Sequence, residues 1–295
     1  MVLAAGFGTR LRPHTLVRPK PLFPVLDIPL LQRVIAQLRA CGVVKVVVNA
    51  HHLREQISAL LADEQDVLVQ LEEIELGTGG GLRLAMEHFG GEPFLAVNGD
   101  IVHDIDLAAV YNNHRSSGAR VTMVLHDCPR FNNVLVGEDG RIVRFGASAS
   151  NMEPGQRLLA FTGIQVIDPA VLTSMPEGVF WNIIDCYSAL LVDGGRLQAH
   201  TVTGHFWTDM GTPADYLDLH GSILRQGKMA DWLVDQDKTV VIGNEVCLGR
   251  DVTCEDWVVI GSRARIGDGC RLTRTVVWDG AQVSPGTVLS DCIVC

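Results

Sequence analysis

Four cationic side chains lie close together near the start of the chain, in a stretch that holds no carboxylate. Residues 4–22 read AAGFGTRLRPHTLVRPKPL, and the cations among them are Arg10, Arg12, Arg18 and Lys20. The chain as a whole has the opposite balance, with 24 Lys+Arg against 34 Asp+Glu and a formal net charge of -10. Because Gly6 and Gly8 let the backbone turn and approach a ligand closely, this stretch suits a small anion such as a phosphate.

The chemistry of this stretch differs from two common phosphate-binding motifs. It has no G-x-x-x-x-G-K-[ST] run, and residues 10–13 stand where the dinucleotide fingerprint needs a small residue opening a helix. We expect the backbone N–H groups of residues 6–9 to form an anion cradle, with the Thr9 hydroxyl beside it. Arg10 offers a planar fork for phosphate oxygens, and Lys20 offers a compact positive charge.

Composition restricts the kinds of partner and compartment. Hydrophobic residues make up 47% of the 295 residues and charged residues 20%, which predicts a large core. The acidic balance argues against nucleic acids and anionic membranes as partners, and no apolar run reaches the roughly 18 residues that span a bilayer. No secretory signal is visible, and eight dilute cysteines favour a cytoplasmic protein with reduced thiols. The closing C-x-x-C of Cys292 and Cys295 lacks the two further ligands of a zinc site.

Strands and helices alternate over the first part of the chain and must position the cationic stretch. Strands are expected at residues 2–4, 43–48, 67–71, 94–97 and 120–125, and helices at residues 30–41, 53–61, 82–89 and 106–117. This alternation predicts an α/β fold with a doubly wound sheet, which binds ligands at the carboxyl ends of its strands.

From about residue 131 the pattern changes to antiparallel strands, which makes the predicted sheet a mixed one. These strands are expected at residues 134–136, 142–145 and 158–167. Helices at residues 182–191 and 213–224 are expected to return the chain to the first sheet.

A different repeat fills the end of the chain. Apolar residues recur at every sixth position in two rows, Ile242, Leu248, Cys254, Ile260, Ile266, Leu272 and Trp278, and Val246, Val252, Val258, Ala264, Cys270 and Val276. A period of six matches neither a helix nor a single strand, and it is typical of a parallel β-helix with one hexapeptide per face. We therefore predict a catalytic domain over residues 1–225, a linker over residues 226–238 and a hexapeptide-repeat domain over residues 239–295.

The opening stretch is the first of several ordered blocks that resemble a known family. L-A-A-G-x-G-T-R-L-x-P-x-T-x-x-x-P-K-P-L, from Leu3 to Leu22, is similar to the motif of the sugar-1-phosphate nucleotidyltransferases, also called nucleoside-diphosphate-sugar pyrophosphorylases. The further blocks are LGTGGG at residues 76–81, VNGD at 97–100, FTG at 161–163 and WTDMGT at 207–212. The resemblance implies a Rossmann-like doubly wound mixed sheet followed by a left-handed parallel β-helix.

The resemblance also implies a reaction, in which a nucleoside monophosphate passes from a nucleoside triphosphate to a sugar 1-phosphate and pyrophosphate is released. The attacking phosphate oxygen is already ionised at pH 7, so the reaction needs charge neutralisation and in-line placement rather than an activated Ser, Cys or His. By this resemblance Arg10 would hold the β- and γ-phosphates, and Lys20 would bridge the α-phosphate and the sugar phosphate. Asp100 and Asp209 are the carboxylates that the family uses for a divalent metal, and oxygen ligands of this kind suit Mg²⁺.

The remaining site residues follow from the same resemblance. The nucleotide-binding positions are Leu3, Ala4, Ala5, Gly6, Gly8, Thr9, Gly77, Thr78 and Gly79, and Glu72 or Glu73 lies where relatives read the base edge. The sugar-binding positions are Asn133 and Gly163. Residues 131–133 read FNN in place of the family's Tyr-Gly pair, and residues 144–157 lack its Glu-Lys pair, which leaves the sugar open.

Several alternatives stay open at this point. The LGTGGG block and the repeat are similar to mannose-1-phosphate guanylyltransferases, and the triple glycine also resembles N-acetylmuramate-1-phosphate uridylyltransferases, so GTP and UTP both remain. The alternative function is a catalytically inactive regulatory or assembly subunit, which need not retain the four residues Arg10, Lys20, Asp100 and Asp209. Acyl transfer by the repeat is disfavoured because no histidine follows His220. The open end and flat faces of a β-helix predict a homo-oligomer, and the reaction predicts a place in nucleotide-sugar biosynthesis for cell-envelope polysaccharide.

Overall fold

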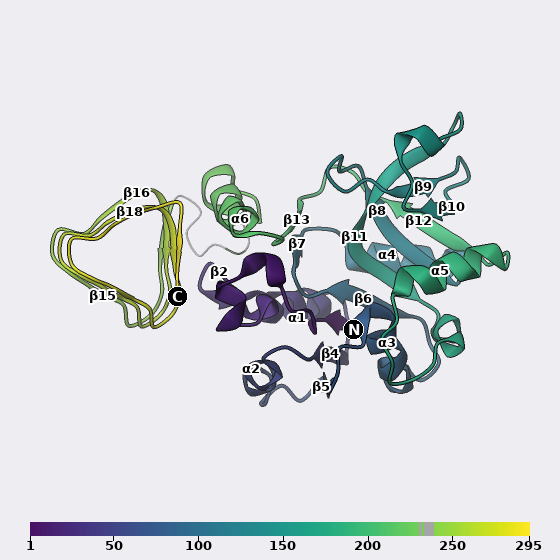
Figure 1. Ribbon diagram of the computed structural model, residues 1–295, viewed down its shortest axis with the longest axis horizontal. Coiled ribbons are helices and arrows are strands. Elements are labelled where there is room, and N and C mark those ends of the chain that lie inside the picture. Colours follow the sequence, from purple (N-terminus) through teal and green to yellow (C-terminus); the bar gives the residue numbers. More distant parts are fainter. Residues whose placement is uncertain (230–231, 233–238) are drawn as a thin grey trace. The chain divides into compact units, whose positions relative to one another are not determined.

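The chain folds as two units, each assembled from segments that are distant in the sequence. The computed structural model describes residues 1–229, 232 and 239–295 (Figure 1). The first unit comprises Met1–Phe7, Val34–Ile101 and Ile105–Trp207, and the second comprises Gly8–Arg33, Val102–Asp104 and Thr208–Cys295. The second unit therefore combines the cationic stretch with the C-terminal repeat. The domain boundaries expected from the sequence stay a prediction, and the expected linker at residues 226–238 lies largely outside the described residues.

A mixed sheet forms the centre of the first unit. Its strands are β1 (Val2–Leu3), β4 (Val46–Ala50), β5 (Val67–Leu71), β6 (Phe94–Asn98), β8 (Val121–His126), β9 (Val134–Val136), β10 (Ile142–Phe145), β11 (Arg157–Ile167) and β12 (Leu197–Thr201). Strands β5, β4, β1 and β6 are parallel neighbours, β11 is antiparallel to β6, β8 and β9, and β12 is parallel to β8. The carboxyl ends of β1, β4 and β6 thus meet at one edge, where doubly wound sheets bind their ligands.

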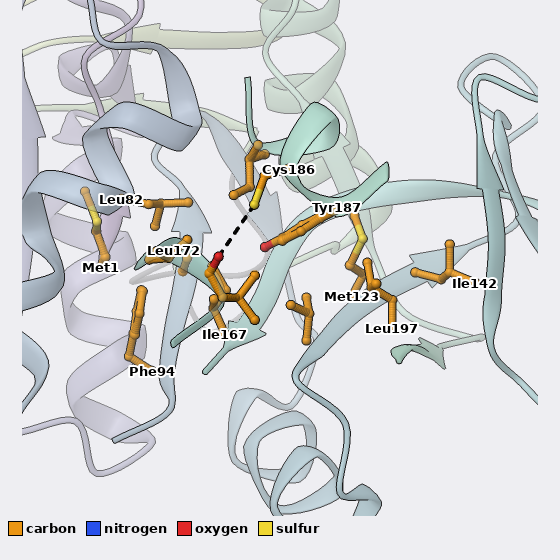
Figure 2. Packing of buried hydrophobic residues seen from close by; sticks show 14 of the residues in the cluster. Met1, Leu82, Phe94, Met123, Ile142, Ile167, Leu172, Cys186, Tyr187 and Leu197 are labelled. Atoms are coloured by element: carbon orange, nitrogen blue, oxygen red, sulfur yellow. Dashed lines mark hydrogen bonds between the residues drawn. The ribbon is translucent and has the colours of Figure 1, made fainter. Parts of the chain in front are cut away.

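Helices cover both faces of this sheet. The helices are α1 (Leu30–Ala40), α2 (Arg54–Leu60), α3 (Gly77–Ala85), α4 (Leu107–Ser117) and α5 (Ile183–Val192). Figure 2 shows Leu82 of α3 and Tyr187 of α5 in one buried cluster with Met123 of β8. Thr122 points to the other face of β8, where its hydroxyl lies 2.9 Å from Nδ1 of His114 in α4. This two-sided cover holds the strand ends in fixed positions.

The C-terminal part of the second unit is a stack of coils, built from short parallel strands. These strands are β14 (Val240–Ile242), β15 (Cys247–Leu248), β16 (Thr253–Ile260), β17 (Arg265–Ile266), β18 (Arg271–Val277), β19 (Gln282–Val283), β20 (Val288–Ser290) and β21 (Ile293–Val294). Val240 pairs with Val258, eighteen positions on, which corresponds to three hexapeptides in each turn of the chain. Figure 1 shows the strands stacked as triangular coils, and we call residues 239–295 the coil stack.

The six-residue rows expected from the sequence hold only as far as Leu272. Val258 pairs with Thr275, seventeen positions on, so the chain omits one residue at this turn. As a result Val277, and not Trp278, joins the interior apolar cluster. Trp278 and Val276, the last members of the two six-residue rows, therefore lie outside the interior apolar cluster.

The second unit also contains α6 (Pro213–Gln226) and, wholly or in part, four short strands. These are the β2 (Pro24–Val25) and β3 (Ile28–Pro29) hairpin and the pair β7 (Ile101–His103) and β13 (Trp207–Asp209). The α6 helix packs on β16 and β18, where the His220 ring stacks on Trp257 with centroids 6.0 Å apart. The buried face of this helix contacts the coil stack, and the expectation that it returns the chain to the first sheet stays a prediction.

Other elements also differ from the sequence-based expectation. Helix α3 begins at Gly77 and not at residue 82, and strand β4 begins three residues later than expected and ends two residues later. Strand β12 was not predicted, and neither were the short strands β2, β3, β7 and β13. The LQAHT sequence of β12 carries too few apolar residues to signal a strand. Among the residues that the structure describes, every helix is too short or too polar to cross a lipid bilayer.

Candidate active site

The first residue after β1 is held by a chain of buried hydrogen bonds in the first unit. The Ala4 N–H donates to the side-chain oxygen of Asn49 at 2.8 Å, and Asn49 Nδ2 donates to Glu72 Oε1 at 2.7 Å. Both side chains are 2% exposed. The predicted nucleotide-binding residues Leu3 and Ala4 are therefore fixed by the sheet on both sides. Sequence reasoning missed Asn49, although a lone amide in the apolar strand VVVNA was an available signal.

Glu72 and Glu73 were both candidates for the base-reading position, and the structure distinguishes them by burial. Glu72 is buried, and this burial raises the pKa of its carboxyl group. Its Oε2 atom has no hydrogen-bond partner among the described residues. Glu73 is exposed, and its Oε1 lies 3.0 Å from Nη1 of Arg54. Glu72 is thus the member of the pair that lies inside the protein.

The glycine run at the start of α3 packs closely against its surroundings. A Cβ atom on Gly79 would lie 2.8 Å from the carbonyl oxygen of Trp181, and the Gly79 N–H donates to that oxygen at 2.8 Å. A Cβ atom on Gly81 would lie 2.7 Å from Glu72 Oε1. These contacts explain why glycines occupy a helix that they would otherwise weaken. The nucleotide-binding role of Gly77, Thr78 and Gly79 stays a prediction.

Asp100 follows β6 in a turn that packs against the end of β1. The Gly99 N–H donates to the Leu3 carbonyl oxygen at 2.8 Å. The Asn98 side chain lies against Gly163, which has a φ of +84° and whose Cβ, if present, would lie 2.8 Å from Asn98 Nδ2. Only glycine meets both requirements easily. The structure therefore brings the predicted residues Leu3, Asp100 and Gly163 to neighbouring positions at one edge of the sheet.

Gly163 lies in a bulge of β11. The register between β11 and β8 shifts between Phe161 and Gln165, and such bulges often occur beside active sites. The Thr162 carbonyl oxygen in this bulge accepts a hydrogen bond from Trp207 Nε1 at 2.8 Å. Trp207, the first residue of the WTDMGT block, thus contacts the FTG block at this bulge.

The second predicted sugar-binding residue, Asn133, is exposed. Its N–H donates to the Leu159 carbonyl oxygen of β11 at 3.1 Å, and its carbonyl oxygen accepts from Ala147 at 3.0 Å. Its backbone thereby joins the strands beside the FTG bulge, while a contact of its side chain with sugar stays a prediction.

In the second unit, the cationic stretch folds back on itself. We call residues 8–29 the signature loop. The Thr15 hydroxyl donates to the Gly8 carbonyl oxygen at 3.0 Å, and a Cβ atom on Gly8 would lie 3.4 Å from Cβ of Lys20. Lys20 is only 7% exposed and opens the short 3₁₀ helix Lys20–Leu22. This folding places Lys20 beside the start of the loop, where Thr9 and Arg10 follow Gly8.

Arg10 lies beside Asp209, which comes from the last motif block. Arg10 Nη2 and Asp209 Oδ2 are 4.0 Å apart, and the Arg10 side chain is largely exposed. A Cβ atom on Gly211 would lie 2.9 Å from Asp209 Oδ2 and 3.1 Å from both Arg10 Nη1 and Asp215 Oδ2. One guanidinium and two carboxylates therefore surround the space that a side chain at Gly211 would fill. An exposed ion pair at this distance adds little stability, which favours a binding role for the arrangement.

The donor set is suited to a hard cation that takes part of its coordination from a ligand. Asp100 belongs to the first unit and Asp209 to the second, and their joint use stays a prediction. Within the described ranges, no three His, Cys, Asp or Glu side chains form a group that would hold a metal on its own. Mg²⁺ is commonly held by one or two carboxylates together with phosphate oxygens and water, and these residues fit that pattern.

Comparison with known proteins decides the family. The family model described as Nucleotidyl transferase matches residues 1–226. The chain belongs to this family. A mannose-1-phosphate guanylyltransferase of Mycobacterium tuberculosis is 30% identical, over 98% of this chain and 82% of its own length. A UTP--glucose-1-phosphate uridylyltransferase of Synechocystis sp. is 28% identical, over 100% of this chain and 79% of its own. This nucleotidyltransferase is therefore an enzyme of the sugar-1-phosphate nucleotidyltransferase family.

Solved structures agree with the fold of the nucleotidyltransferase. A putative glucose-1-phosphate thymidylyltransferase from Bacillus anthracis matches with a TM-score of 0.63 and 20% identity, over 74% of this chain and 92% of that one. HddC from Yersinia pseudotuberculosis, complexed with GMP-PN, matches with a TM-score of 0.61 and 20% identity, over 74% and 96%. These likenesses confirm the predicted α/β fold with a mixed sheet.

Proposed function

We propose that this nucleotidyltransferase transfers a nucleoside monophosphate from GTP to a sugar 1-phosphate and releases pyrophosphate. The observation that carries the proposal is the convergence of Arg10, Asp209 and Asp215 around Gly211, next to a loop that folds Lys20 against Gly8. The parallel strand ends supply the remaining motif residues. Two separated motif blocks thus provide the cations and carboxylates that a reaction between two phosphates requires.

The protein's own residues act through charge and placement. A sugar-phosphate oxygen attacks the α-phosphorus, forming a new P–O bond as the bond to the β-phosphate oxygen breaks. The electron pair of that bond leaves with pyrophosphate, whose negative charge Arg10 stabilises. Lys20 neutralises the α-phosphate and the incoming phosphate, which would otherwise repel each other. Because the nucleophile is already ionised, no side chain has to remove a proton.

The metal assignment follows from the carboxylates. Asp100 and Asp209 would hold Mg²⁺, which when bound supplies positive charge to phosphate oxygens. Glycine at position 211 keeps a side chain away from Asp209 Oδ2, which a Cβ atom there would approach to 2.9 Å.

The choice of GTP over UTP is supported by Glu72. A carboxylate is an acceptor only, and the guanine edge offers two adjacent donors, N1–H and the N2 amino group. Uracil offers one N–H between two carbonyl acceptors, which a carboxylate repels. The guanylyltransferase name of the M. tuberculosis relative points the same way.

We also infer that the coil stack is a left-handed parallel β-helix of the hexapeptide class and that it supports a homo-oligomer. The eighteen-residue register of Val240 and Val258 and the apolar interior support this assignment. The proposed reaction would serve nucleotide-sugar biosynthesis in the cytoplasm, for polysaccharides of the cell envelope.

A pyrophosphate-release screen tests the function. GTP, UTP and other nucleoside triphosphates are each paired with a panel of sugar 1-phosphates in the presence of Mg²⁺. We expect turnover with GTP, its loss on adding EDTA, and its return with excess Mg²⁺. Glu72→Gln should reduce the preference for GTP over UTP. Absence of turnover with every pair would instead favour the inactive regulatory or assembly subunit.

The carboxylates are tested in the same assay. Asp100→Ala and Asp209→Ala should each lower kcat by about 10³-fold or more through the lost metal charge, with the thermal midpoint nearly unchanged. The matched control is Asp218→Ala, which removes an exposed carboxylate from α6 and should leave kcat at the wild-type value.

A further inference from the structure

The signature loop is held against the coil stack by side chains that the proposed reaction does not use. Arg18 Nη1 donates to Asp279 Oδ1 at 2.7 Å. The same guanidinium lies 4.6 Å from the ring centroid of Trp278, in cation–π contact. Asp279 and the aromatic ring thus occupy both the edge and the face of Arg18. These two contacts attach the signature loop to the coil stack through Arg18, whereas Arg10 and Lys20 are proposed to contact phosphates.

Trp278 links the loop to α6 as well. Its ring contacts Phe23 of the loop with centroids 4.7 Å apart. Its Nε1 donates to the Tyr216 hydroxyl at 3.2 Å, and that hydroxyl donates to the Pro24 carbonyl oxygen. The indole is almost completely buried by these contacts. It takes this outward position because the coil omits one residue between the pairs formed by Glu255 and Val258.

A second attachment lies at the tip of the β2–β3 hairpin. Asp27 accepts a hydrogen bond from the Ser262 N–H at 2.8 Å and another from the Ser262 hydroxyl at 2.6 Å. Asp27 has a φ of +69°, in the left-handed region that a tight hairpin turn uses. Both ends of the loop segment that carries Lys20 are therefore attached to the coil stack.

We propose that Asp279 and Trp278 are positioning residues for nucleotidyl transfer, acting through Arg18. This inference rests on the proposed function, because it assigns them the task of holding Lys20 and Arg10 in place. Lys20 lies two positions after Arg18 and three before Phe23. Residues on both sides of Lys20 in the sequence therefore contact Trp278. Within the signature loop, strands β2 and β3 pair over two residues each. The contacts of Arg18 and Phe23 with Trp278 therefore restrain a loop that has little main-chain pairing of its own. Fixing cationic groups before substrate binds reduces the cost of reaching the transition state.

A double-mutant cycle tests the proposal. Arg18→Gln and Asp279→Asn should each lower kcat/KM for GTP by about tenfold, less than the hundredfold that a 1 Å misplacement can cost. The double variant should be no worse than either single variant, because the two residues act through one contact. The matched control is Asp291→Asn, which removes one of the two carboxylates paired with Arg274 elsewhere on the coil stack and should leave kcat/KM unchanged.

Hydrogen exchange gives a readout that does not depend on turnover. Amide exchange of residues 8–22 should be at least about fivefold faster in Asp279→Asn and in Trp278→Leu than in the wild type, and unchanged in Asp291→Asn. Wild-type kcat/KM in Asp279→Asn, a multiplicative loss in the double variant, or unchanged exchange would each overturn the inference while the proposed function stands. A wild-type enzyme without turnover would overturn the proposed function, and with it the catalytic role given to these residues.

Discussion

The strand ends of the first unit and the signature loop of the second unit hold their predicted site residues by different means. Ala4 follows a strand that is paired on both sides by β4 and β6, and a buried amide at Asn49 binds its N–H. The loop has instead a two-residue strand pair and contacts such as Arg18 with Asp279 and Asp27 with Ser262. Main-chain pairing therefore fixes one half of the predicted site, and side chains remote in sequence fix the other.

Because they are held by different contacts, the strand ends and the signature loop should respond to different substitutions and solution conditions. A strand end within a covered sheet moves only if the core is disturbed. A loop held by an ion pair, by the edge-on and cation–π contacts of an indole and by a buried histidine responds to charge substitution and to pH. The following substitutions probe one half at a time.

The largest effect is expected at Lys20. Lys20→Met keeps a buried apolar stem but removes the ammonium group, and kcat should fall by about 10²–10³-fold. Lys20→Arg, which restores a positive charge with a different shape, should recover part of this loss. Steady-state kinetics together with thermal melting measures both. A loss below about fivefold in Lys20→Met, with the fold intact, would remove the loop from the proposed chemistry.

The second effect is a pH dependence of the second unit's stability. His220 is fully buried, with its Nε2 accepting from the Leu26 N–H at 3.3 Å and its Nδ1 2.9 Å from the Tyr216 carbonyl oxygen. Burial lowers the pKa of His220 to about 4, with a smaller effect of the Arg33 charge in the same direction. The unfolded chain, with a histidine pKa of about 6.5, binds the proton more readily, so stability falls as pH drops.

The loss in free energy of unfolding should be about 3 kcal/mol, spread between pH 6.5 and pH 4 and complete below pH 4. Urea unfolding at a series of pH values, followed by the fluorescence of the buried tryptophans, measures it. His220→Gln keeps an acceptor for Leu26 and should flatten this dependence. An equally steep pH dependence in that variant would assign the effect to other groups.

The smallest effect compares two glycines, one from each unit. Gly163→Ala forces a side chain into a left-handed backbone conformation and should lower the free energy of unfolding by about 1–2 kcal/mol. Gly211→Ala needs no such conformation, but it fills the space beside Asp209 and Arg10, and should lower kcat/KM about tenfold with little loss of stability. Urea unfolding and steady-state kinetics on both variants separate the effects. The reverse pattern would contradict the division between the two halves.

Much of the first unit follows from patterns in the sequence. The strands at β5, β9 and β10 have the expected bounds, because each is an apolar run ended by turn residues. The start of α3 does not follow from local preference, since glycines favour a turn there. Packing against Val179 and Trp181 selects glycine inside a helix, and that contact joins segments about a hundred residues apart.

The sequence predicted the motif residues of the candidate site, but not the residues that hold them in position. The motif blocks identified Arg10 and Asp209, and the structure places them 4.0 Å apart. Asn49 and Trp278 escaped prediction for different reasons. The role of Asn49 depends on which strands become neighbours, and that of Trp278 depends on a one-residue change of register that a fixed six-residue period conceals.

That shortened turn has a consequence for how the repeat responds to a deletion. In a periodic chain, a turn that is one residue shorter shifts the phase of all residues after it. Val277 therefore takes the interior position, and the indole of Trp278 lies one position later, outside the coil. Deleting Val276 would shift the phase once more and place the ring opposite Ile260, an interior position, without altering any group that contacts substrate. A one-residue deletion in a remote coil is therefore expected to remove the Trp278 contacts with the signature loop while the proposed catalytic residues stay unchanged.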